Sequence, residues 1–281
     1  MIKIVYKYLC ILLIIFIVLY MFINFLFSKY IFPKALYQRS SVIYRTPERN
    51  SWDYEDVFVS VGKEKTHGWY IPCENPKGFI LFSHGNAGNV ADRLESVGIF
   101  RNLGMSVLVY DYGGYGQSTG KPSEERCCQD ALAMWRWLTE EKKVLPGQVV
   151  LFGRSLGGAV TANLATKVNC AGVILESTFL STVDVAKDMF RWFPARFARG
   201  NEFNTKEKAN QIKSPVLVIH SPEDTLIKYY HGKQIFDLLS VDKEFLEIRG
   251  DHNEGFIITG EKYHDGLRNF IEKVLTGKNR E

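Results

Sequence analysis

Cysteine motifs and long basic runs are both missing from this chain of 281 residues. The five cysteines include the adjacent pair Cys127 and Cys128 but no C-x-x-C spacing, which argues against a redox motif of that kind. No H-x-x-H-type spacing or Cys/His cluster occurs, so we expect no metal site. The formal net charge of +4 is mild, and no Lys/Arg run is long enough to indicate a nucleic-acid partner. We therefore predict that most of the thiols are free and pack inside the domain, and that the domain lies in a reducing compartment.

A dinucleotide fingerprint is also missing. The glycine-rich pieces at 85–88 and 114–116 do not fit G-x-G-x-x-G, and we therefore expect no cofactor. Internal repeats and low-complexity linkers are likewise lacking. The residues after position 34 number 281 − 34 = 247, which is the size of one α/β domain with a substantial core.

Charge is absent from Tyr8 to Ser28, a run that is almost wholly apolar. About 20 such residues cross a hydrocarbon core as a helix. We predict a single-pass membrane anchor at residues 8–28, with residues 1–34 as the anchor segment and 35–281 as the globular domain. A cleavable signal peptide is the alternative, but its apolar region is normally about 7–15 residues and an A-x-A-like site would follow. The basic residues after the span slightly favour a cytoplasmic domain, and the side of the membrane stays open.

Short apolar runs alternate with helical patterns along the rest of the chain. They predict a doubly wound, mostly parallel sheet of the α/β class, opened by an antiparallel pair around Val61-Gly62. The expected helices include 124–141 and 157–167. The expected strands are 54–60, 64–71, 78–83, 105–110, 148–152, 171–176, 215–220 and 244–248.

Only about 38 residues separate Glu176 from Ser214, which is too little for a large lid domain. We therefore predict a minimal lid and a fairly open site. An aromatic and basic stretch at 189–197 would form one wall. Its side chains would hold an acyl chain, lie on the bilayer with the arginines at lipid phosphates, or simply pack a helix.

The motif with the clearest chemical meaning is Gly153-Arg154-Ser155-Leu156-Gly157, which fits G-x-S-x-G. An apolar run leads into it and a run of small residues leads out, so a strand, a tight turn and a helix are predicted. Such a turn places Ser155 in a strained and exposed position, as the nucleophile of a serine hydrolase requires. The alternative is a glycine-rich turn with a bystander serine.

A serine nucleophile needs a base, and the base needs an orienting acid. Downstream, Asp224 follows a buried strand pattern in a turn, with Glu223 as the adjacent competitor. His252 follows the last strand and is the one histidine of six that fits both the chain order and a strand end. We predict Asp224 and His252 as acid and base; the alternatives are solvated turn acids and a surface histidine.

An oxyanion hole would complete the site. Its donors are usually the amide after the nucleophile, here Leu156, and one from the loop after an earlier strand. That loop contains Asn86 among glycines, so its N–H is the expected second donor. His84 precedes the nucleophile and is interpreted as a residue that fixes the loop.

Taken together, these stretches resemble the α/β-hydrolase superfamily, and within it the membrane-anchored subgroup of α/β-hydrolase-domain proteins. The resemblance covers about residues 75–256 and implies Ser155 as nucleophile, Asp224 as acid, His252 as base and the Asn86 and Leu156 amides as oxyanion donors. Gly113 departs from the pattern, since relatives usually carry arginine there. The stretches are FSHGNAGN (83–90), VYDYGGYGQSTG (109–120), FGRSLGGAV (152–160), ESTFLSTVDVA (176–186), SPVLVIHSPEDTLI (214–227) and GDHNEGF (250–256).

The expected activity is hydrolysis of an ester or thioester at the membrane. The resemblance further suggests a lipid or an acylated protein as substrate, because some members of the subgroup cleave long-chain acyl thioesters from proteins. Two alternatives remain open: a peptidase or amidase with the same triad, and a noncatalytic anchored binding module. The predicted partners are the acyl substrate and the lipid bilayer, and the oligomeric state is not predicted.

Overall fold

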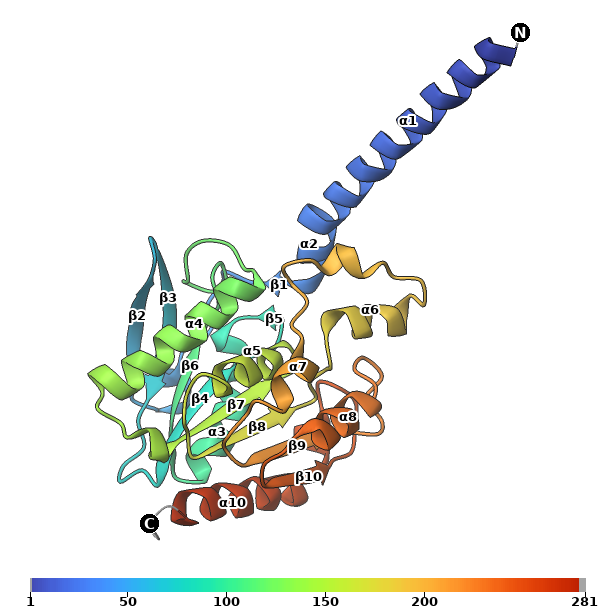
Figure 1. Cartoon of the computed structure of the whole chain (residues 1–281). Coiled ribbons are helices and arrows are strands. Elements are labelled where there is room, and N and C mark those ends of the chain that lie inside the picture. The colour runs from blue at the N-terminus through green and yellow to red at the C-terminus, as the bar shows by residue number, and fades with distance from the viewer. Residues whose placement is uncertain (1, 278–281) are drawn as a thin grey trace.

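A sheet of eight strands forms the centre of the domain in the computed structural model, which describes residues 2–277 (Figure 1). Its order is β10-β9-β8-β7-β4-β6-β3-β2, parallel from β10 to β6 and antiparallel for the last two strands. Every predicted strand is present, with ends within two residues of the prediction. The strands are β2 (Glu55–Val61), β3 (Glu64–Ile71), β4 (Gly78–Ser83), β6 (Met105–Tyr110), β7 (Val149–Arg154), β8 (Gly172–Glu176), β9 (Val216–His220) and β10 (Lys243–Glu247).

Helices cover both faces of this sheet, as a doubly wound fold requires. On one face lie α4 (Glu124–Arg136), α5 (Leu156–Ala165), α7 (Thr205–Ala209) and α8 (Tyr230–Leu238), and on the other lie α3 (Leu94–Asn102) and α10 (Glu261–Thr276). The predicted fold class is therefore confirmed. The smaller helical elements are α6 (Thr182–Met189), α9 (Gly255–Ile258), the π-helical turn Trp137–Glu141 after α4, and 3₁₀ turns at Pro47–Asn50, Val90–Arg93, Pro146–Gln148 and Ala195–Ala198.

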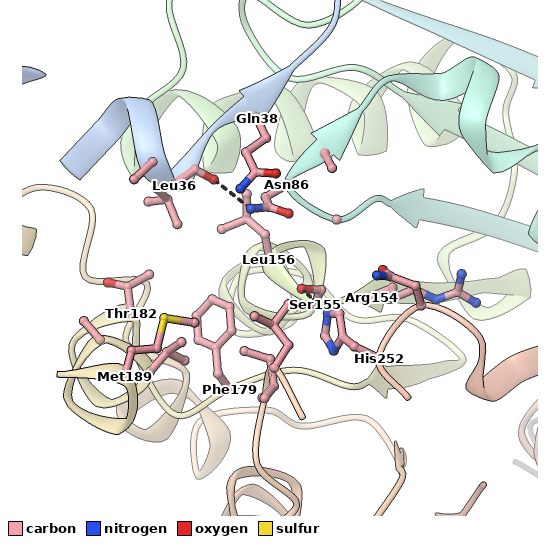
Figure 2. A pocket seen from close by; sticks show the side chains of 18 of the residues that line it. Leu36, Gln38, Asn86, Arg154, Ser155, Leu156, Phe179, Thr182, Met189 and His252 are labelled. Carbon is pink, nitrogen blue, oxygen red and sulfur yellow. Dashed lines mark hydrogen bonds between the residues drawn. The ribbon is translucent and has the colours of Figure 1, made fainter. Parts of the chain in front are cut away.

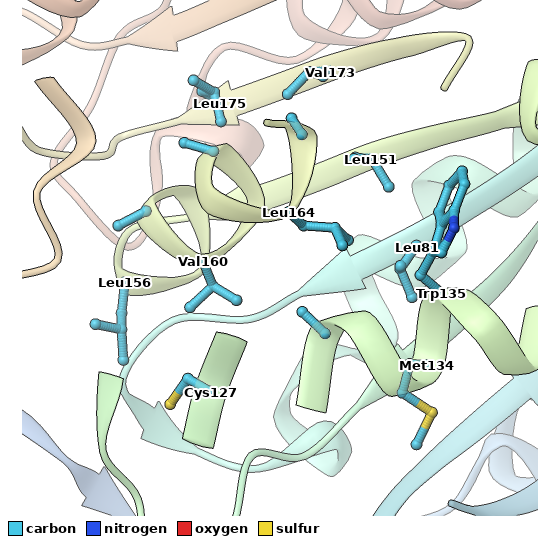
Figure 3. Packing of buried hydrophobic residues seen from close by; sticks show 14 of the residues in the cluster. Leu81, Cys127, Met134, Trp135, Leu151, Leu156, Val160, Leu164, Val173 and Leu175 are labelled. Atoms are coloured by element: carbon cyan, nitrogen blue, oxygen red, sulfur yellow. The ribbon is translucent and has the colours of Figure 1, made fainter. Parts of the chain in front are cut away.

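The core between α4, α5 and the sheet positions the start of α5. Leu156, Val160 and Leu164 recur every four residues on α5, and all three are buried. They pack with strand residues such as Leu151 and Leu175 in one cluster (Figure 3). Each fully buried leucine contributes about 1.5–3 kcal/mol relative to exposure. The N-terminus of α5 is thereby fixed against the carboxyl end of β7.

The N-terminal helix projects away from the domain (Figure 1). Helix α1 (Ile2–Leu26) continues through a π-helical turn (Phe27–Ile31) into α2 (Phe32–Leu36). The resulting apolar helix Tyr6–Leu36 has 31 residues and is long enough to cross a membrane, and none of its most apolar window is buried. It extends past the predicted span, so the division at residue 34 falls inside a helix and stays a prediction.

The chain enters the domain directly after α2. Tyr37 is buried, and its hydroxyl donates to Asn201 Oδ1 at 2.6 Å. The short strand β1 (Gln38–Arg39) then pairs in parallel with β5 (Ala87–Gly88), which lies in the loop after β4. This pairing ties the end of the apolar helix to the loop predicted to carry the oxyanion amide.

Candidate active site

Ser155 occupies the tight turn between β7 and α5, with φ +55° and ψ −121°. This is a rare conformation for a residue other than glycine, and it is the strained turn that the motif predicts. Neighbouring glycines make it sterically possible. A Cβ on Gly157 would collide with the carbonyl oxygen of Ser83, and one on Gly153 would collide with the carbonyl oxygen of Gly157. Gly157 is thus required by the close approach of β4 to α5, and Gly153 by the close approach of β7 to α5.

The structure brings Ser155, His252 and Asp224 into one hydrogen-bonded chain, although 97 residues separate the first two. His252 Nε2 lies 3.0 Å from Ser155 Oγ, and His252 Nδ1 lies 2.7 Å from Asp224 Oδ2. All three are nearly buried, with 5–9% of each residue exposed. The expected exposure of Ser155 is therefore wrong, because the surrounding loops and helices leave it open only to a cavity. The arrangement has the geometry of a nucleophile, a base and an orienting acid.

Asp224 is held by the turn that follows β9. Its Oδ1 accepts hydrogen bonds from the backbone N–H of Leu226 at 3.0 Å and of Ile227 at 2.7 Å. One carboxylate oxygen is therefore satisfied by the backbone, and the other is turned toward His252. The neighbouring acid Glu223 points elsewhere, because its Oε2 accepts from the N–H of Gly250 at 3.0 Å.

A second acid ties the same two loops together. Asp251 accepts from the Thr225 N–H at 2.8 Å and from the Thr225 hydroxyl at 2.9 Å. Hydrogen bonds from the backbone N–H groups of Thr225 and His252 lower the pKa of Asp251. These contacts fix the position of His252 relative to Asp224, a role that the sequence pattern did not reveal.

His220, at the end of β9, is a second histidine beside Asp224. It is fully buried, its Nε2 donates to the Ile227 carbonyl at 2.8 Å, and the same nitrogen lies 3.6 Å from Asp224 Oδ2. Burial lowers the pKa of His220, so its imidazole stays neutral. Chain order argues against His220 as the base, because it precedes Asp224. Its position at a strand end is the one sequence feature that indicates a place near the site.

The loop after β4 lies directly against the nucleophile. A Cβ placed on Gly85 would lie 3.5 Å from the Ser155 Cβ. Asn86 is fixed there by two contacts: its carbonyl accepts from the Tyr115 hydroxyl at 2.8 Å, and its side-chain amide donates to the Leu36 carbonyl at 3.0 Å (Figure 2). Asn86 and Leu156 both line the cavity beside Ser155, and their role as oxyanion donors stays a prediction.

His84, by contrast, lies beneath this loop. It is fully buried, with its Nε2 3.3 Å from Asp111 Oδ1. The side chain of Asp111 also accepts from the Val90 N–H at 3.0 Å. His84 therefore participates in the network that supports the loop, as its interpretation as a loop-fixing residue implies.

Ser155 and His252 open into a cavity of about 460 Å³. In Figure 2, Leu36 lies on one side of the serine, and Phe179 and Met189 lie on the other. The walls are mainly apolar: Phe32, Ala35 and Leu36 from α2; Val185, Ala186 and Met189 from α6; and Phe179, Leu226 and Ile227 from loops. The wall from α2 was not predicted, because the sequence pattern there indicates only a membrane helix.

Two arginines also line the cavity. Arg154 is buried in an ion pair, with its Nε 2.7 Å from Glu176 Oε1, and its guanidinium stacks 4.1 Å from the centre of the Phe256 ring. Tyr263 donates to the same carboxylate at 2.6 Å. Removing one partner of such a pair leaves an uncompensated buried charge. Arg154 directly precedes the nucleophile, so its ion pair with Glu176 fixes the end of β7 there. Arg93 lines the same cavity.

Gly113 is the position at which the resemblance predicts an arginine. The space beside its Cα is occupied by the side chain of Arg126. A Cβ on Gly113 would lie 2.8 Å from Cγ of Arg126, which reaches over from α4. Arg126 Nε pairs with Asp130 Oδ1 at 2.6 Å, and Asp130 Oδ2 accepts the Gly113 N–H at 2.8 Å. These contacts fill the space at Gly113, and none of them involves Ser155, Asp224 or His252.

Sequence relatives agree with this architecture. The family described as serine aminopeptidase, S33, matches residues 74–204. The mouse (Mus musculus) α/β-hydrolase domain-containing protein 17C is 32% identical over 242 residues, which are 81% of this chain and 73% of that protein. The chain belongs to the α/β-hydrolase superfamily. An uncharacterized protein of Mycobacterium tuberculosis is 31% identical over 210 residues, 74% of this chain and 75% of the relative.

Solved structures share the α/β-hydrolase fold at low sequence identity. The Pyrococcus furiosus esterase Pf2001 has a TM-score of 0.73 and 19% identity, with 85% of this chain and 98% of the esterase covered. Est1E of Butyrivibrio proteoclasticus, solved with ferulic acid bound, has a TM-score of 0.64 and 14% identity, with 80% and 100% covered. Within residues 2–277, no group of three or more His, Cys, Asp or Glu side chains is arranged to hold a metal ion.

Proposed function

We propose that this α/β-hydrolase is a membrane-anchored serine hydrolase that cleaves an ester or a thioester. The observation that carries the proposal is the chain Ser155–His252–Asp224, with contacts of 3.0 and 2.7 Å, at the floor of an apolar cavity. A buried serine in a strained turn, next to an oriented imidazole, is the arrangement that activates a hydroxyl for acyl transfer.

The reaction follows from these positions. His252 Nε2 takes the proton of Ser155 as Oγ attacks the acyl carbon. The tetrahedral intermediate then collapses, the alcohol or thiol leaves with the proton returned by His252, and an acyl-Ser155 ester remains. Water attacks this ester while His252 accepts its proton. The bond between the acyl carbon and Ser155 Oγ then breaks, His252 returns the proton to Oγ, and the carboxylic acid is released. Asp224 holds the imidazole with Nδ1 protonated and stabilises its positive charge throughout.

The intermediate carries an oxyanion that the amides of Asn86 and Leu156 would bind. Losing one such donor typically costs about 3 kcal/mol of transition-state stabilisation. The position of the Asn86 loop against Ser155, and the start of α5 at Leu156, support this assignment. Because Tyr115 and Leu36 hold Asn86 from two sides, its amide would need little reorganisation during the reaction.

An ester or thioester substrate is favoured over a peptide with a free amino terminus by the cavity walls. Among the described residues that line the cavity, none is Asp or Glu, whereas a pocket for a free α-ammonium group needs a carboxylate. The cavity of about 460 Å³ is within the usual range for small-molecule sites and is suited to an acyl chain. A lipid or an acylated protein is the substrate class that this lining and a membrane location favour.

The proposal also includes the anchor at residues 8–28 and the catalytic domain at 35–281. The exposed apolar helix supports it, since 31 residues at 1.5 Å each exceed the roughly 30 Å of a hydrocarbon core. Extraction of membranes with alkaline carbonate tests this part. An anchored protein stays with the lipid at full length, whereas a processed signal peptide releases a shorter soluble domain.

Labelling with a fluorophosphonate probe tests the catalytic part. We expect the detergent-solubilised protein to be labelled, and the variants Ser155→Ala and His252→Ala to lose the label. His264→Ala is the matched control, because this histidine lies on α10 and does not line the cavity. A folded wild type that takes up no label would contradict the proposal and favour a noncatalytic binding module.

A further inference from the structure

The segment that begins with the last residue of α6, residues 189–199, separates its aromatic side chains into two sets. We call it the interfacial loop. Phe193 and Phe197 are partly buried, whereas Phe190 and Trp192 are 70% and 86% exposed. Met189, at the end of α6, is 53% exposed and also lines the cavity. Large apolar side chains exposed next to one another indicate a contact surface rather than ordinary solvent exposure.

The inward set binds the end of the apolar N-terminal helix. The ring of Phe197 stacks on that of Phe27 with centroids 4.3 Å apart, and the ring of Phe193 lies 5.6 Å from that of Phe32. These contacts place the interfacial loop at the level where the proposed membrane span ends, so its outward side chains continue the apolar surface of the helix.

A polar contact lies one to two turns nearer the N-terminus of the same helix. Arg196 Nε donates to Asn24 Oδ1 at 2.6 Å, and another nitrogen of its guanidinium donates to the Tyr20 hydroxyl. Tyrosine and arginine are typical of the layer between hydrocarbon and water, where the ring stays apolar and the charge reaches phosphate. The layer between hydrocarbon and water is therefore expected to extend along the helix from these side chains to the ring contacts at Phe27 and Phe32.

The charges on the two chain segments that meet here all have one sign. The segments 27–39 and 189–199 contain six basic residues and no acidic one, namely Lys29, Lys34, Arg39, Arg191, Arg196 and Arg199. All six are exposed. Basic residues at a membrane surface are attracted by anionic lipid within a Debye length.

We propose that the interfacial loop lies in the headgroup layer of an anionic bilayer, with Phe190 and Trp192 inserted toward the acyl chains. Continuity with the apolar helix and the one-signed charge identify lipid as the occupant of this surface. The cavity lining shared by Phe32 and Met189 then adjoins the bilayer, so an acyl chain passes from the lipid to Ser155 without crossing water. This last consequence rests on the proposed hydrolase function, whereas insertion of the loop does not.

Tryptophan fluorescence tests the insertion in the full-length protein. Wild type and Trp192→Phe are reconstituted in vesicles of phosphatidylcholine with about 30% phosphatidylserine, with or without lipids brominated on the acyl chains. The other tryptophans lie outside the interfacial loop, so the difference in emission between the two proteins reports Trp192. We expect blue-shifted emission that brominated lipid quenches, and weaker quenching in vesicles of phosphatidylcholine alone.

Three results would overturn the insertion. Trp192 emission characteristic of water, without quenching, means that the loop stays outside the bilayer. Equal quenching in neutral and anionic vesicles removes the part played by the charges. A blue shift that persists in detergent, together with a dimer by light scattering, means that a second copy of the chain covers the surface.

Activity tests the consequence for the substrate. The double variant Phe190→Asp/Trp192→Asp should hydrolyse a long-chain ester embedded in anionic vesicles about tenfold more slowly than wild type, because charged side chains oppose insertion. Its rate on a water-soluble short-chain ester should be unchanged, since neither residue lines the cavity. Leu145→Asp is the control, because Leu145 is 65% exposed and lies in the connection between α4 and β7.

The outcomes separate the two proposals. Equal rates of wild type and double variant on the embedded ester would overturn delivery through the loop. A wild type that hydrolyses neither ester would overturn the hydrolase function, and the fluorescence result would still decide whether the loop inserts.

Discussion

Replacing Asp224 by asparagine tests the reasoning about the triad most directly. Oδ1 of this side chain accepts two backbone N–H groups, at 3.0 and 2.7 Å, and Oδ2 faces His252 Nδ1 at 2.7 Å. In Asp224→Asn, the amide oxygen keeps both backbone bonds, and the NH₂ group is then directed at His252. Since NH₂ only donates, the imidazole must leave Nδ1 unprotonated and carry its proton on Nε2.

The wrong tautomer removes the base. With its proton on Nε2, His252 faces Ser155 Oγ at 3.0 Å as a donor and cannot take the hydroxyl proton. The analogous change in a serine protease lowers kcat by about 10⁴. We expect a similar loss here, which corresponds to about 5.4 kcal/mol of transition-state stabilisation at 1.36 kcal/mol per factor of ten. Because the backbone bonds persist, stability should change by no more than about 1 kcal/mol.

The assay is hydrolysis of a soluble short-chain ester, with thermal unfolding measured on the same samples. Glu223→Gln is the matched control, because a glutamine oxygen still accepts from the Gly250 N–H and the Glu223 side chain is 55% exposed. Its rate should stay close to wild type. The reasoning is refuted by an Asp224→Asn variant that retains a tenth of the activity, or by an equal loss in both variants.

Three further predictions concern the elbow, the cavity and pH. Gly157→Ala should lower the unfolding temperature, because the added Cβ collides with Ser83 and overpacking typically costs about 1–3 kcal/mol. Gly277→Ala is the control, since the space around Gly277 is open, and its unfolding temperature should not change. Similar unfolding temperatures for the two variants would contradict the steric argument. Ala186→Trp should abolish hydrolysis of long-chain esters and spare short ones, and a uniform loss across a chain-length series would refute the assignment of the acyl pocket. Burial lowers the pKa of His220, so below about pH 6.5 the unfolded state binds a proton that the folded state excludes, and the free energy of unfolding should decrease as the pH is lowered. In denaturant titrations at pH 7 and 5, His220→Gln should show a smaller decrease than wild type. An equal decrease in both proteins would contradict this prediction.

Much of the fold and the order of the site follow from local pattern. Strand ends are predictable here because parallel strands are buried on both faces and read as short apolar runs. The turn at Ser155 is predictable because Gly153 and Gly157 flank it in a fixed spacing. Chain order then selects Asp224 and His252, since an α/β-hydrolase places its acid and its base after successive later strands.

Other features depend on contacts between distant parts of the chain. Glu223 and Asp224 are adjacent and chemically alike, and only the turn that offers two N–H groups to Asp224 gives them different partners. The apolar pattern before residue 37 specifies a helix but not that Phe32 and Leu36 form a wall of the cavity.

The loop at 189–199 shows the same division. Its sequence alone determined that aromatic and basic side chains are interspersed there. That pattern is compatible with three roles for the segment: an acyl-binding wall, a contact with the bilayer, and ordinary helix packing. The tertiary structure decided which rings face inward, because Phe193 and Phe197 meet an apolar helix more than 150 residues earlier in the chain, at Phe27 and Phe32. Local pattern specifies what a segment can bury, whereas the partner that buries it is determined only when the whole chain has folded.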